Sequence, residues 1–413
     1  MLKILKIKVN GYKLLENNFE IDLTTQARVY NDDTFKEVLQ IDDGLNTLKS
    51  IAIVGGNSSG KSTVLTLLLK TFIFLQTGRW EYIEREFKGS QIQLDIIFYL
   101  NQAIYKYSVD FNKPAPISLS NINKFCQIKN EKLIEMKYVK SKWKKCLQTI
   151  NNDGINRTQS LEASLDDTSA ITKLTKNEIF VDDFYTNNYT TFNEVIVRNT
   201  FFTSLNSCSK ELASSIIQLL DNSIEYIIYN NSDNVIFKRF NENEIIINSS
   251  ELIMLLSAGT FRGVELYIRA INALKFGKIF IVDEIENCFQ KNLVYNLLFL
   301  FNDESINRTG AQIIFSTHYV EILDYLKRRD SIFITHKENG KINIKNLYSD
   351  YDVRTELLKS KQFDNNVFNT SLNYNQLLKV RRNLINELYS NNDWRLNWIS
   401  FYKSIARKKY FKI

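Results

Sequence analysis

Alternating apolar and polar residues open the chain and predict a β-strand. Residues 1–15 read MLKILKIKVNGYKLL, in which Leu5, Ile7 and Val9 alternate with lysines. These lysines also interrupt the apolar core that a signal peptide requires, so we expect no such leader. A second alternating segment, QIQLDIIFYLNQAIYKYSVDF at residues 91–111, predicts a strand hairpin.

Three shorter runs are apolar throughout, which is the pattern of strands buried on both faces of a parallel sheet. They are IAIV at residues 51–54, IFIV at 279–282 and IIF at 313–315. We expect an apolar helix after the first run, over residues 61–76, and another before the second, over 260–274. Strands that alternate with helices in this way indicate an α/β protein.

The composition is that of an ordinary globular protein. With 413 residues and 44% hydrophobic side chains, the chain can bury a large core, as two or three structural units or as one elaborated α/β domain. No apolar run approaches the roughly 18 residues of a membrane-spanning helix. The four cysteines form no CxxC pair and only two histidines occur, so we expect reduced cytoplasmic thiols and neither a zinc site nor disulfides.

The first apolar run leads into GGNSSGKST at residues 55–63, which matches the phosphate-binding loop pattern. Glycines let several backbone N–H groups point at one anion, and the following helix adds its N-terminal dipole. The Lys61 ammonium would reach the β- and γ-phosphates of ATP, and the Ser62 hydroxyl would ligate Mg²⁺. The predicted nucleotide-binding residues of this loop are Gly55, Gly56, Asn57, Ser58, Ser59, Gly60, Lys61, Ser62 and Thr63.

An acidic pair follows the second apolar run, in KIFIVDEIE at residues 278–286. Asp283, at the carboxyl end of the expected strand, would hold Mg²⁺ directly or through water. Glu284 would polarise the water that attacks the γ-phosphate.

Two further stretches complete the set of candidate site residues. LLSAGTFR at residues 255–262 places Ser257, Gly259 and Thr260 at the start of the expected helix, where they would form a second anion cradle. His318 follows the third apolar run, in the position of a residue that senses γ-phosphate.

The order and spacing of these motifs exclude small GTPases and kinases, because about 220 residues separate the loop from Asp283. The chain resembles the ABC-type ATPases of the RecF/SMC/OLD group, in particular the compact AAA-family ATP-binding branch. GGNSSGKST is similar to the Walker A motif of that branch, LLSAGTFR to its signature, IFIVDEIEN to its Walker B run and FSTH to its switch. The residues KIKVNGYKLLENNFEIDL resemble its opening hairpin.

The resemblance implies an ABC-ATPase head, with a parallel P-loop sheet, an antiparallel β subdomain, an inserted helical subdomain and a helical C-terminal extension. We therefore expect four parts: an N-terminal lobe at 1–111, an inserted helical and β region at 112–250, a C-terminal lobe at 251–348 and a basic extension at 349–413. It also implies ATP and Mg²⁺ as cofactors, and a dimer in which Ser257 and Gly259 of one copy serve the nucleotide of the other.

The resemblance has gaps. Phe289, Gln290 and Lys291 stand where the family often has Leu-His-Pro, so the loop that crosses the dimer interface differs. The glutamine of the Q-loop is not assigned, since Gln91 and Gln93 are equally placed at the start of the hairpin.

The remaining segments are basic or helical. Residues 129–145 carry seven Lys and two Glu, which suits a solvated helix face or a contact with nucleic acid or a protein. Residues 199–220 resemble paired helices, and 374–413 two amphipathic helices. The net charge is +7, and residues 394–413 hold six Lys or Arg and no acid. This tail would contact nucleic acid, contact an acidic protein or pack on the ATPase core.

We found no second active site in the sequence. Asp350 and Asp352 imitate part of a Toprim nuclease motif, but no second acidic strand follows. The Arg329 to His336 spacing imitates a HEPN ribonuclease, but SIFITH predicts a strand where that motif needs a helix.

The leading functional expectation is an ATPase that controls a separate effector, as in the Septu and PARIS anti-phage systems, whose ATPase subunits the chain resembles. A RecF-like DNA repair ATPase is the alternative. A transporter subunit is disfavoured, because the signature is not LSGGQ and the segment between the two halves of the site is long.

Overall fold

The computed structural model divides into two compact units, Met1–Phe368 and Asn369–Ile413. The residues that the structure describes are 2–30, 37–114, 125–137, 155–156, 168–176, 178, 181–185, 201–202, 205, 207–229, 234–287, 290–352, 357–370 and 374–389.

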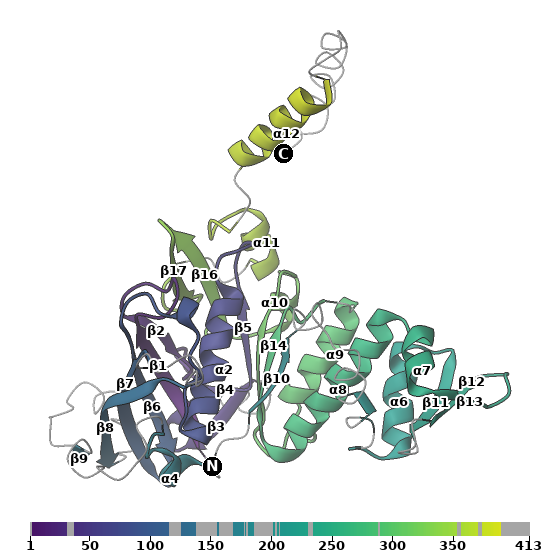
Figure 1. Cartoon of the computed structure of the whole chain (residues 1–413), viewed down its shortest axis with the longest axis horizontal. Coiled ribbons are helices and arrows are strands. Elements are labelled where there is room, and N and C mark those ends of the chain that lie inside the picture. The colour runs from purple at the N-terminus through teal and green to yellow at the C-terminus, as the bar shows by residue number, and fades with distance from the viewer. Residues whose placement is uncertain are drawn as a thin grey trace. The chain divides into compact units, whose positions relative to one another are not determined.

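A six-stranded sheet forms the centre of the first unit, in the order β10-β14-β15-β5-β16-β17 (Figure 1). Neighbouring strands run parallel from β10 to β16, and β17 is antiparallel to β16. The three apolar runs are confirmed as strands of this sheet. The strands are β5 (Ser50–Val54), β10 (Val181–Tyr185), β14 (Ile279–Asp283), β15 (Gln312–Ser316), β16 (Ile332–Glu338) and β17 (Lys341–Asn346).

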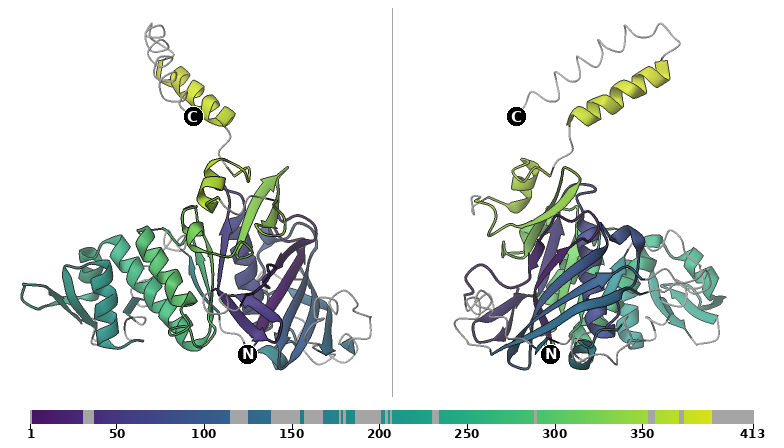
Figure 2. Two further views of the ribbon diagram at one scale, coloured as in Figure 1. Left: turned by 180° about the vertical axis from the view of Figure 1, so that it is seen from behind. Right: turned by 60° about the vertical axis from the view of Figure 1, so that its left-hand side comes forward.

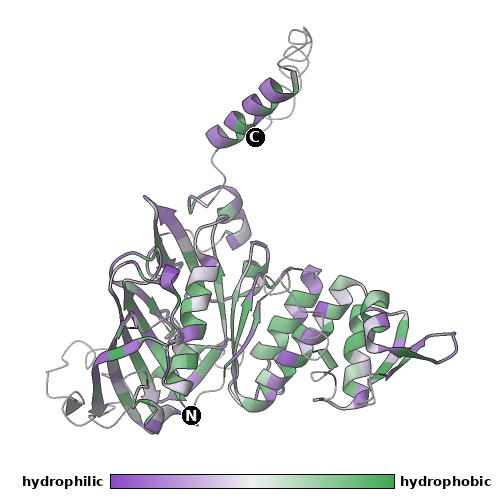
Figure 3. Cartoon of the chain, in the orientation of Figure 1, coloured by the Kyte–Doolittle hydropathy of each residue, from purple (hydrophilic) through white to green (hydrophobic). Residues whose placement is uncertain are grey.

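Each face of the central sheet belongs to a different hydrophobic core. Ile51 and Ile53 contribute to a core shared with helix α2 and an antiparallel sheet, whereas Ala52 and Val54 contribute to a core shared with helices α8 and α9. The layers are visible in Figure 1 and Figure 2. Because both faces are covered, the runs 51–54, 279–282 and 313–315 are hydrophobic throughout (Figure 3), which is why they showed no alternation.

The second sheet is antiparallel, in the order β2-β1-β6-β7-β8-β9. Both predicted hairpins are confirmed, as β1 pairs with β2 and β6 with β7. The predicted α/β class, with a parallel sheet and an antiparallel β part, is therefore confirmed. The strands are β1 (Lys3–Asn10), β2 (Phe19–Asp22), β6 (Gln91–Leu100), β7 (Ala103–Asn112), β8 (Gln127–Lys137) and β9 (Ile155–Asn156).

The lysine-rich segment 129–145 is not a helix in its described part. Its first nine residues lie in β8, which pairs along its whole length with β7. A long-range partner strand decides this conformation, and the local charge pattern could not show it. Residues 138–145 lie outside the described residues.

The described residues of the segment 112–250 contribute to three sheets. β8 and β9 extend the antiparallel sheet, and β10 is an edge strand of the central sheet. A third sheet has the order β11-β12-β13, with β11 (Ile224–Tyr229), β12 (Asn234–Arg239) and β13 (Ile245–Asn248). Of the expected paired helices at 199–220, the structure describes α6 (Lys210–Leu220) and single helical positions before it.

The remaining elements of the first unit pack around these sheets. The helices are α2 (Lys61–Thr77), η1 (Glu84–Glu86), α4 (Thr172–Thr175), α7 (Ser249–Leu255), α8 (Ala258–Phe276), α9 (Lys291–Asn302), α10 (Ile322–Tyr325) and α11 (Lys359–Asp364), and β3 (Val38–Asp42) pairs with β4 (Leu45–Leu48). Helices α2 and α8 confirm the expected helices at 61–76 and 260–274. None of the described helices is long and apolar enough to span a membrane.

The second unit contains one described helix, α12 (Tyr374–Tyr389). It is the first of the two amphipathic helices expected at 374–413, and the second lies outside the described residues. Its apolar side chains are exposed, between 38% and 67%: Leu377, Leu378, Val380, Leu384, Ile385 and Leu388.

Candidate nucleotide site

The phosphate-binding loop connects β5 to α2, and glycines stand at both of its ends. Gly55 has φ 152° and Gly60 has φ 109°, conformations that favour glycine. A Cβ on Gly55 would lie 2.6 Å from Ser59 Oγ, and one on Gly60 would lie 2.5 Å from Ile342 Cγ2. A side chain at either position would therefore force this part of the loop to shift.

Lys61 begins α2 and points back into the loop. Its ammonium donates to the carbonyl oxygens of Gly55 and Gly56, at 3.1 and 3.2 Å. Burial lowers the pKa of Lys61, and the carboxylates of Asp283, Glu284 and Glu286 act in the opposite direction. The ammonium thus occupies the centre of the loop, beside three acidic groups that arrive from β14.

A second contact braces the loop from the neighbouring strand β16. The Ser59 hydroxyl lies 2.7 Å from Thr335 Oγ1, and Thr335 donates to the carbonyl oxygen of Val54 at 3.1 Å. Ser59 and Thr335 are both buried. The side chain of Ser59 therefore holds the loop to the neighbouring strand. Sequence reasoning missed Thr335, because no motif contains it.

The acidic run ends β14 beside the loop, since β15 pairs with both β14 and β5. Asp283 is 1% exposed, and its Oδ1 accepts a hydrogen bond of 2.5 Å from Ser316 Oγ. Ser316 Oγ in turn accepts from the backbone N–H of Glu284 at 2.7 Å. Ser316, which ends β15, thus ties the two acidic residues to the next strand.

Glu284 and the predicted switch residue His318 face each other across this edge of the sheet. Glu284 Oε1 lies 3.9 Å from His318 Nε2, and Asn287 Nδ2 donates to Glu284 Oε2 at 3.1 Å. Glu284 has φ 52°, an uncommon conformation for a residue with a side chain, and such strain is frequent at functional sites. The structure therefore brings Lys61, Asp283, Glu284 and His318 to one place, as the motifs predicted.

Glu286 joins the same group, although it was not a candidate. It is 8% exposed, and its Oε1 accepts a hydrogen bond of 2.5 Å from the backbone N–H of His318. Its position in the DEIE run was the available signal, but sequence alone could not show that it turns inward.

The residues present fit ATP with Mg²⁺. Asp283 Oδ2 is buried and has no hydrogen-bond partner in the described part of the chain, so a second ligand on this oxygen would satisfy it. Ser62 is exposed in the first turn of α2, on the same loop as Lys61. Carboxylate and hydroxyl oxygens are ligands that Mg²⁺ accepts together with phosphate oxygens.

The signature segment begins α8, apart from this group. Ser257 is its N-cap and accepts from the backbone N–H of Thr260 at 3.0 Å, with the two hydroxyl oxygens 2.8 Å apart. Ser257 is exposed, Gly259 half-buried and Thr260 buried. Within the described residues, no hydrogen bond joins these three to the phosphate-binding loop.

The structure also shows where the other residues that the sequence singled out lie. Gln91 and Gln93 are exposed at the start of β6, and Gln290 and Lys291 begin α9, while Phe289 lies outside the described residues. His336 lies in strand β16, as SIFITH predicted, and its Nε2 is 2.6 Å from Tyr351 Oη. Burial raises the pKa of the free thiol of Cys126 to about 12.

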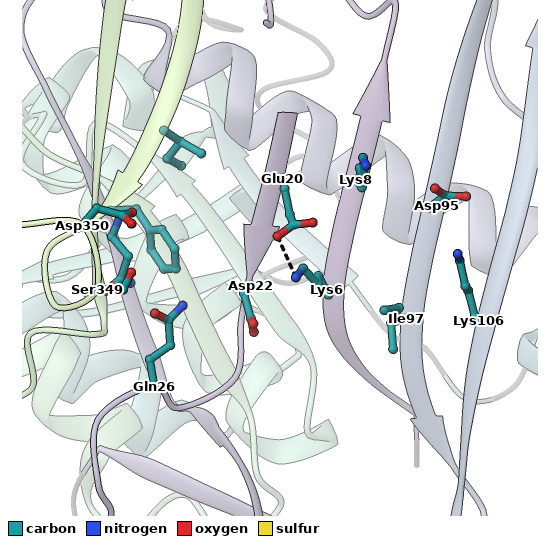
Figure 4. Close-up of a pocket in the computed structure, with 13 residues that line it drawn as sticks. Lys6, Lys8, Glu20, Asp22, Gln26, Asp95, Ile97, Lys106, Ser349 and Asp350 are labelled. Carbon is teal, nitrogen blue, oxygen red and sulfur yellow. Dashed lines mark hydrogen bonds and ion pairs between the residues drawn. The ribbon is translucent and has the colours of Figure 1, made fainter. Parts of the chain in front are cut away.

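A polar hollow of about 620 Å³ lies elsewhere in the first unit, and none of the predicted site residues lines it. Its lysines come from β1 and β7, and its carboxylates come from β2, β6 and Asp350, which follows β17. Lys6 pairs there with Glu20 at 2.6 Å (Figure 4). The hollow is therefore separate from the candidate nucleotide site.

Comparison with known proteins places this site in a family. Residues 50–324, about two thirds of the chain, match the family described as "AAA domain, putative AbiEii toxin, Type IV TA system". A comparison with curated proteins finds no match. Among solved structures, the chain is similar to the SMC head domain from Thermotoga maritima, with 12% identity and a TM-score of 0.42, over 85% of this chain and 100% of that one. The matched residues run from β5 through the phosphate-binding loop, the signature and the acidic run to the switch histidine, and the chain belongs to this AAA domain family.

Proposed function

We propose that this chain is an ABC-type ATPase that binds and hydrolyses ATP, closes as a dimer or larger oligomer, and controls a separate effector in bacterial anti-phage defence. Membership in a AAA domain family implies nucleotide binding, typically with Mg²⁺. The observation that carries the proposal is the convergence of Lys61, Asp283, Glu284 and His318 at the carboxyl ends of β5, β14 and β15.

Each residue has a distinct part in hydrolysis. The loop amides and Lys61 would bind the phosphates, and Ser62 with Asp283 would hold Mg²⁺, which would supply charge neutralisation on the phosphate oxygens. Glu284 accepts the proton of the attacking water. His318, held beside Glu284, contacts the γ-phosphate and helps orient that water.

The position of the signature segment supports the proposed oligomer. Ser257 is exposed at the start of a long helix and has no bond to the loop of its own chain. A helix N-terminus of this kind favours an anion, so the nucleotide of a second copy is its proposed ligand.

Two observations support the proposed effector: the family description and the positive charge of the C-terminal unit. The family description names a toxin of a type IV toxin–antitoxin system, which supports control of a toxic activity. Residues 369–413 hold nine Lys and Arg against two Asp and Glu, so they carry a net charge equal to that of the whole chain, +7. This concentration of charge supports docking of an acidic effector, and it equally supports the alternative, a RecF-like ATPase that binds DNA.

The test separates nucleotide binding from hydrolysis. Lys61→Ala should abolish binding of a fluorescent ATP analogue. Glu284→Gln should bind ATP within about twofold of the original protein but hydrolyse it about 100-fold more slowly, because the phosphate contacts remain and the base is lost. Glu338→Gln, an exposed acid at the end of β16, is the control and should change neither. Unchanged turnover in Glu284→Gln would remove that residue from the proposed role.

A further inference from the structure

Glu286 connects the turn after β14 to the switch histidine after β15. Its Oε1 accepts a hydrogen bond of 2.5 Å from the backbone N–H of His318. A hydrogen bond from a backbone N–H to a carboxylate is charge-assisted, and such bonds are among the stronger kinds in proteins. Because it reaches the backbone, it restrains where the residue sits and leaves the imidazole ring free to meet substrate.

The same carboxylate is buried and only half satisfied. Glu286 is 8% exposed, and its Oε2 has no hydrogen-bond partner among the residues that the structure describes. Burying a carboxylate with an unpaired oxygen is costly, so the hydrogen bond to the His318 backbone must offset part of that cost. The charge of Glu286 also acts on Lys61, which places the carboxylate between the phosphate-binding loop and the switch.

We propose that Glu286 is a positioning residue, which fixes the backbone of His318 so that its ring stays opposite Glu284. The separation of 3.9 Å between His318 Nε2 and Glu284 Oε1 leaves the ring close to the water-activating carboxylate. Without the bond to Glu286, the segment after β15 loses the contact that sets this distance. The inference rests on the proposed ATPase function for its kinetic consequence, but not for its structural one.

Two variants separate positioning from charge. Glu286→Met keeps the length and volume of the side chain but offers no acceptor. Glu286→Gln keeps an acceptor oxygen for the His318 N–H and loses only the charge. A positioning role predicts that the Gln variant resembles the original protein and that the Met variant does not.

The first measurement needs no hydrolysis. In the nucleotide-free protein, amide hydrogen exchange of a peptide that spans residues 312–320 should become faster in Glu286→Met and stay close to the original rate in Glu286→Gln. Peptides from β5 should be unchanged in both, which shows that the fold is intact. Unchanged exchange at 312–320 in Glu286→Met would overturn the inference, even if the protein proves to be no ATPase.

The second measurement is a double-mutant cycle on hydrolysis. Glu286→Met should lower kcat by about 10- to 100-fold with little change in ATP affinity, and Glu286→Gln should recover most of the loss. In a His318→Ala background, Glu286→Met should change kcat by no more than about twofold, since the two residues act through one contact. Glu321→Gln, an exposed acid three residues from His318, is the matched control and should leave kcat unchanged.

Other results would assign Glu286 a different role. Equal losses in the Met and Gln variants would mean that the charge, through a metal or a proton, matters more than the hydrogen bond. Independent, multiplicative losses from Glu286→Met and His318→Ala would mean that Glu286 acts elsewhere. An inactive original protein would contradict the proposed function, while the exchange measurement would still decide the inference.

Discussion

At the scale of single residues, the phosphate-binding loop depends on a side chain from outside its motif. The Ser59 hydroxyl can donate to Thr335 Oγ1 only because the Thr335 hydroxyl is itself donating to Val54. These two bonds fasten the middle of the loop to β5 and β16, the strands on which it is built. An anion-binding loop works best when its N–H groups already point inward, so this brace should matter for affinity.

We predict that Thr335→Val weakens nucleotide binding. Valine has nearly the volume of threonine, but it leaves the Ser59 hydroxyl buried without a partner, which costs about 1–3 kcal/mol. We expect an affinity for ATP lower by about five- to tenfold, and a lower melting temperature. Thr335→Ser keeps the hydroxyl and should retain most of the affinity. Titration with a fluorescent ATP analogue measures both, and equal binding by the valine variant would show that the loop holds its shape without the brace.

The residues that sequence predicted and those it missed differ in one physical respect. Asp283, Glu284 and His318 lie at or just after the carboxyl ends of β14 and β15, and Lys61 begins the helix after β5. Parallel pairing of these neighbouring strands brings the four residues to one edge of the sheet. Glu286 and Thr335 act through contacts between segments 32 and 276 residues apart in the chain. Only the folded structure shows such contacts.

At the scale of elements, the continuous apolar runs predicted strands correctly, whereas the charged segments did not reveal the strands that they form. β5, β14 and β15 were predictable because both of their faces are buried. β10 reads VDDFY and has only one neighbouring strand, so its sequence carries no such signal. Its register opposite β14 comes from packing, with Asp182 paired to Arg269 and Lys278. β8 is decided in the same way by its pairing with β7.

Helix α8 offers a prediction that separates two roles of Ser257. As N-cap it satisfies the Thr260 N–H, and loss of such a cap costs about 1 kcal/mol. As a proposed ligand it faces the phosphate of a second copy. Ser257→Ala should therefore lower both the melting temperature and ATP hydrolysis. Ser257→Asp should restore the melting temperature, since aspartate is a good cap, but not hydrolysis, since it presents a negative charge to phosphate. If the aspartate variant recovers hydrolysis, measured by phosphate release, Ser257 acts only as the N-cap of α8.

At the scale of the whole molecule, the proposed composite site can be tested by mixing two inactive proteins. Lys61→Ala lacks a working loop, and Ser257→Arg lacks a working signature. In a mixed dimer, one site combines the intact loop of one copy with the intact signature of the other. A one-to-one mixture should therefore regain up to about a quarter of the original rate of phosphate release, given random pairing in a two-fold dimer. A mixture no more active than its components would mean that the site is complete within one copy.

The last prediction concerns the second unit, which has an exposed apolar stripe on α12 and carries a net charge as large as that of the whole chain. At 3.6 residues per turn, Leu377, Leu384 and Leu388 lie on one side of α12, whereas Asn386 lies on the other. All three leucines are more than half exposed, and an isolated helix of this length is marginal in water. We therefore propose that α12 packs on a partner through this stripe, and that the basic residues steer the encounter.

Leu384→Asp should abolish binding of the effector, for example the product of an adjacent gene. Asn386→Asp makes the same change of charge on the polar side of α12 and should only weaken that binding. Binding measured across salt concentrations completes the test, since steering by charge predicts a falling affinity for both the original protein and Asn386→Asp. If Leu384→Asp and Asn386→Asp bind the effector equally well, the apolar stripe of α12 is not the docking surface. If both variants instead bind duplex DNA tightly, the RecF-like alternative is favoured.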